Sequence, residues 1–109
     1  MNITTVINGT FARITPSGDI DADSLAPLHT AVGALSPHVS DLQWDLHHTL
    51  FMDVSGLHLL LPQQLADPIQ HITVVRLCPQ PARLLLLAAD LRPGIFDLAR
   101  LLPAAPVGD

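Results

Sequence analysis

The stretch from Leu50 to Leu60 combines an apolar run, an Asp-Val-Ser-Gly turn and a leucine-rich helical pattern. This order predicts a buried strand, a sharp turn and a helix that packs back on the core. Ser55 would lie exposed at the start of that helix. Free backbone N–H groups and the helix dipole favour negative charge there, so the hydroxyl is a good place to add a phosphate. The stretch therefore indicates a regulatory switch.

Composition and charge narrow the possible classes. The chain has 109 residues, 49% of them hydrophobic, which suits one compact domain. All five basic residues are arginine, all ten acidic residues are aspartate, and the formal net charge is −5. Because the arginines are spread along the chain, they form no basic patch and argue against direct contact with nucleic acid. We expect the partner to be a protein.

The cellular setting is predicted from three absences in the sequence. Cys78 is the single cysteine, so no intramolecular disulfide can form and a reduced thiol is expected. The first residues lack the pattern of a signal peptide. The longest apolar run, from Leu84 to Ala89, is too short for a bilayer, which needs about 20 residues. We expect a soluble, cytoplasmic protein without membrane contact.

The first half of the chain predicts a hairpin followed by a helix. Two β-branched segments, Ile3–Ile7 and Thr10–Thr15, flank an Asn-Gly dipeptide, which favours a tight turn. Apolar residues then recur at helical spacing, which predicts a helix from Asp23 to Leu35. The residues available as its N-cap are Asp21, Asp23 and Ser24.

The middle of the chain predicts a strand, a helix and a second strand. Leu42 to Met52 has the pattern of a mostly buried strand, and a helix should begin near Ser55. Pro62 should kink or stop that helix, because proline removes a backbone hydrogen bond and clashes with the preceding turn. His71 to Leu77 is expected to form a strand, followed by a proline-containing loop at Cys78–Pro81.

The last third of the chain predicts a third helix, whose apolar positions are Leu84, Leu87, Ala88 and Leu91. Arg92-Pro93-Gly94 should end this helix, and Ile95–Leu98 is expected to form an edge strand. The fold class is therefore α/β: a mixed sheet opened by an N-terminal hairpin, with helices packed on it. We expect one domain over residues 1–102 and a frayed tail at 103–109.

Two motifs resemble those of the STAS domain family. They are Gly18-Asp19-Ile20-Asp21, before the first predicted helix, and Phe51-Met52-Asp53-Val54-Ser55-Gly56-Leu57, before the second. Within this family the chain is most similar to the bacterial anti-sigma factor antagonists. The similarity extends over nearly the whole chain, with both motifs in the family's order and at similar separation. The resemblance implies a STAS-like fold.

What the resemblance implies about function is partner switching. The unphosphorylated antagonist binds an anti-sigma factor that is also a serine kinase, so a sigma factor is released to RNA polymerase. The kinase then inactivates its antagonist, and a separate phosphatase resets it. By position, Ser55 would be the phosphorylated residue, with Asp53 as the neighbouring acid and Asp21 beside it. The implied partner surface consists of Asp21, Asp53, Val54, Ser55, Gly56 and His58, with Gly56 permitting close approach of the partner's backbone.

The chain also departs from the family pattern. Val54 stands where many relatives carry a second hydroxyl residue, which removes an alternative acceptor of phosphate. Pro62 shortens or bends the second helix, on a surface that can contact the partner. The residues after Leu98 are too few for the family's full final helix, so part of the sheet is less covered or used in a homodimer.

Other interpretations of the same residues remain open. Ser55 would serve as a plain helix cap without any modification, or Asp53 would equally be the cap. The six histidines lack metal-ligand spacing, and His47 and His48 would point to opposite faces of an extended segment. Neither a G-x-S-x-G elbow nor a G-x-x-x-x-G-K loop is present, so we expect no enzyme activity and no cofactor. The alternative functions are an unphosphorylated STAS adaptor or a small-ligand-binding module in a lipid-transport or sensory complex.

Overall fold

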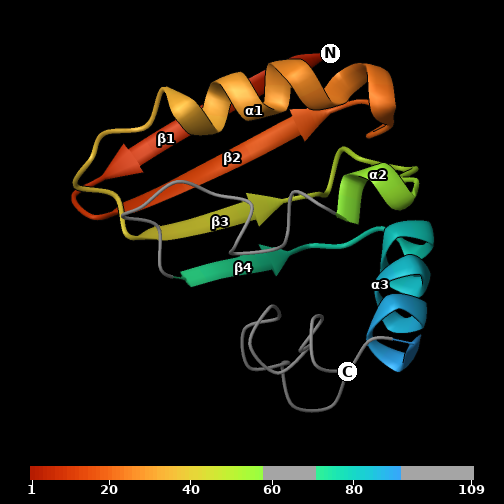
Figure 1. Cartoon of the computed structure of the whole chain (residues 1–109). Helices are drawn as coiled ribbons and strands as arrows, with labels where there is room; N and C mark the ends of the chain where they lie inside the picture. The colour runs from red at the N-terminus through yellow and green to blue at the C-terminus, as the bar shows by residue number, and fades with distance from the viewer. Residues whose placement is uncertain (58–70, 92–109) are drawn as a thin grey trace.

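The computed structural model describes residues 1–57 and 71–91, and every structural statement concerns these residues. One sheet contains the strands β1 (Asn2–Asn8), β2 (Phe11–Ser17), β3 (Asp41–Asp45) and β4 (His71–Val75). Its order is β1-β2-β3-β4, with β1 antiparallel to β2 and the other neighbours parallel (Figure 1). The predicted mixed sheet with an opening hairpin is confirmed.

The hairpin turn lies one residue later than the Asn-Gly dipeptide suggested. Asn8 pairs with Phe11, so the two loop residues are Gly9 and Thr10. Gly9 has φ +63°, whereas Thr10 is not among the residues with positive φ. A type II′ turn requires positive φ only at its first central residue, which is usually glycine. The twist of this turn matches that of the flanking strands.

The first helical region begins as predicted and is capped by Asp21. A 3-10 turn, η1 (Ala22–Ser24), leads into α1 (Leu25–Gly33). The Asp21 carboxylate accepts hydrogen bonds from the backbone N–H groups of Asp23 and Ser24, at 3.0 and 3.1 Å. The Ser24 hydroxyl accepts one from the Asp21 N–H at 2.8 Å. This reciprocal capping box satisfies N–H groups that a helix start leaves unpaired.

The predicted strand from Leu42 to Met52 is wrong beyond Asp45. The Asp45 carboxylate accepts a hydrogen bond from the His47 backbone N–H, and the Thr49 N–H donates to the Leu46 carbonyl at 3.0 Å. These local bonds turn the chain out of the sheet. Met52 then forms a single parallel bridge with Ile20. The second predicted strand also ends early, at Val75, because the next residue has φ +55°, outside the β region.

The expected loop at Cys78–Pro81 is wrong, because α3 (Pro79–Leu91) begins within it. Proline suits the first helical position, where its fixed φ matches the helix and its missing N–H would have been unpaired anyway. The buried residues of α3 are Pro81, Leu85 and Ala88, whereas Leu87 and Leu91 of the predicted apolar face are exposed.

Four predicted features lie outside the described residues. They are the end of the third helix at 92–94, the strand at 95–98, the kink at Pro62 and the tail at 103–109. The domain bounds of 1–102 extend into the same region and stay a prediction. None of the helices in the described ranges is long and apolar enough to cross a membrane.

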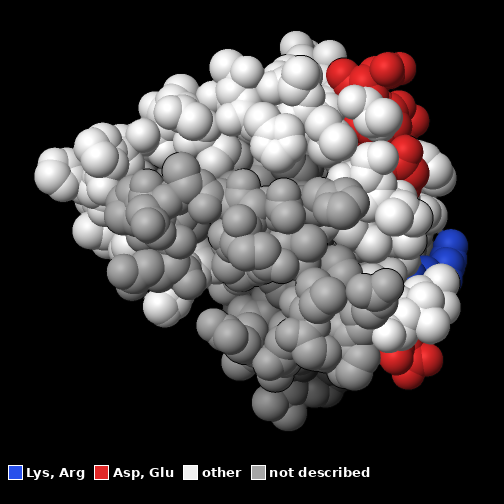
Figure 2. Space-filling view, in the orientation of Figure 1, with Lys and Arg blue, Asp and Glu red and all other residues white. Residues whose placement is uncertain are grey.

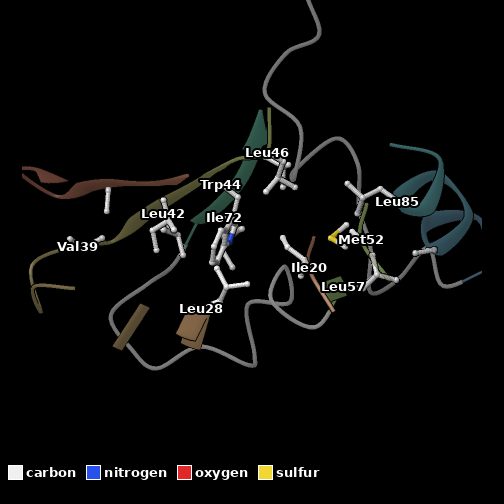
Figure 3. Close-up of a cluster of buried hydrophobic side chains, with 14 residues drawn as sticks. Ile20, Leu28, Val39, Leu42, Trp44, Leu46, Met52, Leu57, Ile72 and Leu85 are labelled. Atoms are coloured by element: carbon white, nitrogen blue, oxygen red, sulfur yellow. The ribbon is translucent and has the colours of Figure 1, made fainter. Parts of the chain in front are cut away.

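The core lies against one face of the sheet (Figure 3). Alternate residues of β2 and β3 point into it, among them Ile14, Leu42 and Trp44, and α1 contributes Leu28. A short helix, α2 (Val54–Leu57), and the first turns of α3 lie beyond the carboxyl ends of the parallel strands (Figure 1). Trp44 is fully buried, and its indole N–H has no hydrogen-bond partner among residues 1–57 and 71–91.

Candidate functional site

The segment Phe51–Asp53, called the clamped segment below, is fixed on one side by the loop between β2 and α1. The Ile20 N–H donates to the Phe51 carbonyl at 3.0 Å, and the Asp53 N–H donates to the Ile20 carbonyl at 3.0 Å. This is the parallel bridge between Ile20 and Met52. The two motifs that carried the family resemblance are therefore hydrogen-bonded to each other through their backbones.

Gln80, in the first turn of α3, fixes the other side of the clamped segment. Its side-chain Oε1 accepts a hydrogen bond from the Met52 N–H at 2.8 Å, and its Nε2 donates to the Met52 carbonyl at 2.9 Å. The amide thus imitates a neighbouring strand, and both backbone polar groups of Met52 are satisfied. Sequence reasoning missed this contact, because nothing in the chain links a glutamine to a residue 28 positions away.

Asp53, and not Ser55, caps α2. The Asp53 carboxylate accepts a hydrogen bond from the Ser55 N–H at 2.8 Å, and the Gly56 N–H donates to the Asp53 carbonyl at 3.0 Å. Ser55 lies in the first turn of α2 and is half-buried, so the predicted exposed position is wrong. Its hydroxyl forms no hydrogen bond with any described residue. The helix-cap interpretation of Ser55 is therefore wrong, because a carboxylate two residues earlier already fills that role.

Gly56 faces the interior of the protein. A Cβ atom at this position would lie 2.4 Å from Met52 Cγ and 2.8 Å from Ile20 Cγ2, closer than real carbon atoms approach. The glycine therefore lets α2 pack directly against the bridge between the two motifs. The sequence-based reason for it, close approach of a partner's backbone, is wrong, since the missing side chain lies on the core side.

Apolar side chains are exposed around the clamped segment. Leu50, Phe51 and Val54 are 71%, 44% and 65% exposed. All three precede Ser55 in the sequence, with the buried Met52 between Phe51 and Val54. Exposed apolar side chains close together are typical of a protein-binding surface. His58, the remaining residue of the predicted partner surface, lies outside the described residues.

Aspartates lie next to this apolar surface. The bridge between Ile20 and Met52 brings Asp21 and Asp53 to neighbouring positions, each one residue beyond the paired residue. An open hollow of about 440 Å³, lined by Asp19, Asp21 and Asp23 among others, adjoins the loop between β2 and α1. Figure 2 shows acidic side chains gathered on this side of the molecule. A new negative charge on Ser55 would add to this acidic edge.

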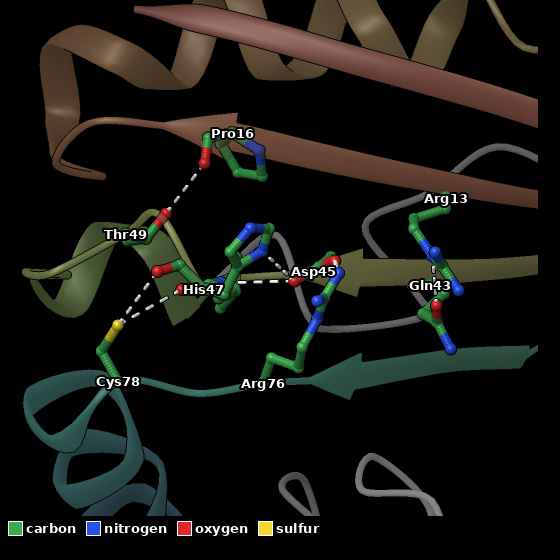
Figure 4. Close-up of polar contacts among 9 residues, drawn as sticks. Arg13, Pro16, Gln43, Asp45, His47, Thr49, Arg76 and Cys78 are labelled. Carbon is green, nitrogen blue, oxygen red and sulfur yellow. Dashed lines mark hydrogen bonds and ion pairs between the residues drawn. The ribbon is translucent and has the colours of Figure 1, made fainter.

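A second polar group, the Asp45 cluster of Asp45, His47 and Arg76, lies at the ends of β3 and β4 (Figure 4). The Asp45 side chain is 1% exposed, lies 2.7 Å from His47 Nδ1 and accepts a hydrogen bond from the Arg76 guanidinium. Burial alone would raise the pKa of Asp45. The hydrogen bonds from Arg76 and His47 outweigh burial and hold that pKa below its usual value of 3.8.

Sequence reasoning missed the Asp45 cluster, although an aspartate within an apolar run was a signal that it would need partners. His47 and His48 do not point to opposite faces as expected for an extended segment. They lie in the turn after β3, with ring centroids 3.7 Å apart. Among residues 1–57 and 71–91, no group of histidine, cysteine and aspartate side chains is arranged to hold a metal ion.

Comparisons with known proteins relate the fold to a solved structure. No protein-family model matches the sequence, and no curated protein matches it either. The structure is similar to that of the anti-sigma factor antagonist SpoIIAA in its unphosphorylated form, with a TM-score of 0.58 and 18% sequence identity. The match covers 96% of this chain and 90% of the SpoIIAA chain. The chain therefore has the STAS fold.

Proposed function

We propose that this chain is a bacterial, cytoplasmic anti-sigma factor antagonist controlled by phosphorylation of Ser55. In its unphosphorylated form it binds an anti-sigma factor that is also a serine kinase, and a sigma factor is released. The kinase binds ATP and provides the catalytic groups. The chain itself is the kinase's binding partner and its substrate. A phosphatase restores the active form. The shared fold with SpoIIAA supports this class of function.

The observation that carries the proposal is the position of Ser55. Its hydroxyl has no hydrogen bond to a described residue, and its backbone is fixed by the Asp53 cap and the clamped segment. A kinase needs a reachable hydroxyl, and a switch needs that hydroxyl at a fixed place in an interface. The fixed backbone of Ser55 and its hydroxyl, which has no structural bond to lose, support this role.

The charges around Ser55 explain why phosphorylation would end binding. A phosphate adds about −1.5 to −2 charge at neutral pH. Asp53 already presents a carboxylate to the Ser55 backbone, and Asp21 lies across the bridge. Like charges repel, and a phosphate next to exposed Phe51 and Val54 would also have to be dehydrated when a partner covers that surface. A loss of about 1.4 kcal/mol already weakens binding tenfold.

The partner surface we propose combines apolar and acidic side chains around Ser55. Leu50, Phe51 and Val54 supply apolar contact, and Asp21 and Asp53 supply charge that selects a partner with basic groups. Gly56 contributes through the packing that sets the position of α2, while His58 remains a proposed contact from the sequence alone.

The test is a paired capture experiment with the full chain. Ser55→Ala and Ser55→Asp baits are incubated with lysate of the native bacterium, and retained proteins are identified by mass spectrometry. We expect the alanine bait to retain an anti-sigma factor with a kinase domain and the aspartate bait to lose it at least tenfold. The captured kinase, purified and given ATP, should phosphorylate the wild-type chain at Ser55.

A matched control is Ser40→Asp, which adds the same charge just before β3, at the end of the sheet away from α2. It should retain the kinase like the wild type. If both Ser55 baits retain the same partner, the residue is not the control point and an adaptor role replaces the proposal.

A further inference from the structure

Strand β1 forms one edge of the sheet, and its outer side pairs with no other described strand. Natural edge strands are protected by charged side chains, prolines or bulges, because unpaired backbone groups can pair with another chain. β1 has none of these: its sequence is Asn-Ile-Thr-Thr-Val-Ile-Asn, paired residue for residue with β2. Val6 and Ile7 are 54% and 47% exposed. This edge is open to strand pairing.

The hairpin turn determines which backbone groups point outward from β1. In a two-residue turn the flanking residues, here Asn8 and Phe11, share a hydrogen bond. Bonded and non-bonded pairs alternate along an antiparallel ladder. The even-numbered residues of β1 therefore direct their N–H and C=O groups toward β2. The N–H and C=O groups of Ile3, Thr5 and Ile7 point outward.

The sequence of β1 is close to a palindrome centred on Thr5. If a second copy of the strand runs antiparallel with Thr5 opposite Thr5, each Ile3 lies opposite Ile7 of the other copy. Asparagine then faces asparagine at both ends, and Thr4 faces Val6, a side chain of almost the same shape. The outward groups of Ile3, Thr5 and Ile7 meet in the same register, as bonded pairs. Side chains and backbone therefore select one alignment.

We propose that two copies of this chain associate through β1 in this antiparallel register, which joins their sheets into one continuous sheet. The interface is isologous, because a twofold axis passes between the two Thr5 residues. It covers the exposed Ile7 with Ile3 of the other copy, on the face of the sheet that carries the core. The exposed edge is thereby removed.

The charge distribution favours a second copy as the occupant of this edge. Each copy carries a net charge of −5, so copies repel wherever their acidic surfaces approach. The first twelve residues contain no charged side chain and no histidine, so pairing along β1 places no like-charged side chains opposite each other. A foreign strand would gain backbone bonds from this edge, but the symmetric sequence adds matched side-chain pairs only for a copy of β1.

The test measures self-association of the full chain and its dependence on residue 5. We expect sedimentation equilibrium and native mass spectrometry to show a species of twice 11.7 kDa. Thr5→Lys should weaken association at least tenfold, because two like charges would lie directly opposite. Thr5→Asp should act similarly. A mixture of the two variants should associate again, since only this register places residue 5 against residue 5.

Thr4→Lys is the matched control, because its lysine would face Val6 and should disturb the dimer much less than Thr5→Lys. If a variant fails to fold, hydrogen exchange of the wild type gives the same answer: the amides of Ile3, Thr5 and Ile7 should gain protection as concentration rises.

A monomeric wild type at millimolar concentration overturns the proposal, as does a dimer that Thr5→Lys leaves intact. Ser55 is not involved, so the dimer and the phosphorylation switch stand or fall separately.

Discussion

The Asp45 cluster and the clamped segment both lie at the carboxyl-terminal edge of the parallel strands, but they are held in opposite ways. Asp45 is enclosed, and bonds from the side chains of Arg76 and His47 hold it. The clamped segment is held through its backbone, by Ile20 and Gln80, while Phe51 stays exposed. Where side chains hold a region in place, those side chains are not free to contact a partner. A region fixed through its backbone can offer its side chains to a partner.

The largest effect expected from this contrast is on the Asp45 cluster. Asp45→Ala removes a buried carboxylate and leaves three nitrogen groups of His47 and Arg76 without their partner, so we expect it to lower the free energy of unfolding by about 3 kcal/mol. Urea unfolding followed by the fluorescence of Trp44 measures it. Asp41→Ala, at a half-exposed carboxylate 3.6 Å from His71, is the control and should change stability by less than about 0.5 kcal/mol. Equal effects of the two substitutions would remove the contrast.

The pH dependence of stability tests the same carboxylate. Because the folded-state pKa of Asp45 is lowered, the unfolded chain takes up its proton first as pH falls. The stability that Asp45 contributes is present above the usual value of 3.8 and is lost as the pH falls through the lowered folded value. Urea midpoints between pH 2 and 6 should therefore fall less steeply for Asp45→Asn than for the wild type. Parallel curves would contradict this assignment.

Gly56→Ala should have the next largest effect. The added Cβ would overlap Met52 and Ile20, so we expect a loss of about 2 kcal/mol and a displaced α2. Gly33→Ala is the matched control, since no side chain of the described part of the chain lies within 4 Å of its Cβ position, and it should be neutral or slightly stabilising. Thermal unfolding compares the two. If Gly56→Ala melts like the wild type, the inward packing of this glycine is not what the site needs it for.

Gln80→Ala should loosen the clamped segment with a moderate loss of stability. Both Met52 backbone groups lose a partner, at a cost of about 1 to 2 kcal/mol, and exchange of the Met52 amide should become faster. Gln80→Glu keeps the acceptor for the Met52 N–H but not the donor to its carbonyl, so its effect should be intermediate. Unchanged amide exchange in both variants would mean that Ile20 alone holds the segment.

The smallest expected change in stability distinguishes the capping role of Asp53 from the proposed modification of Ser55. Asp53→Ala removes the cap and should cost about 1 kcal/mol, whereas Ser55→Ala should change stability by less than about 0.5 kcal/mol. Chemical denaturation of the two variants compares them. A Ser55→Ala loss as large as that of Asp53→Ala would show that the hydroxyl has a structural role.

Local signals predicted the elements that local chemistry controls. The hairpin followed from a glycine next to β-branched segments, and the Asp21 cap followed from an aspartate before an apolar helical pattern. The end of β3 and the start of α3 were missed. In the first case a buried Asp45 redirected the chain, and in the second a proline that looked like a loop residue occupied the first helical position.

The candidate site was predicted only in its sequence-local part. Ser55, Asp53 and Val54 follow one another, so the motif placed them together in the chain and indicated their neighbourhood. Which of them caps α2 depended on backbone geometry, and the capping went to Asp53. The contribution of Gln80 comes from a helix whose position depends on the whole sheet.

The sequence by itself determined the order of strands and helices, the hairpin and the two motifs, because each depends on residues a few positions apart. The tertiary structure decided that Asp45 is enclosed by Arg76, that Gly56 faces the core and that Gln80 completes the site. These contacts join residues from different elements, and their energies depend on burial. Burial is fixed only when the sheet and helices have packed together.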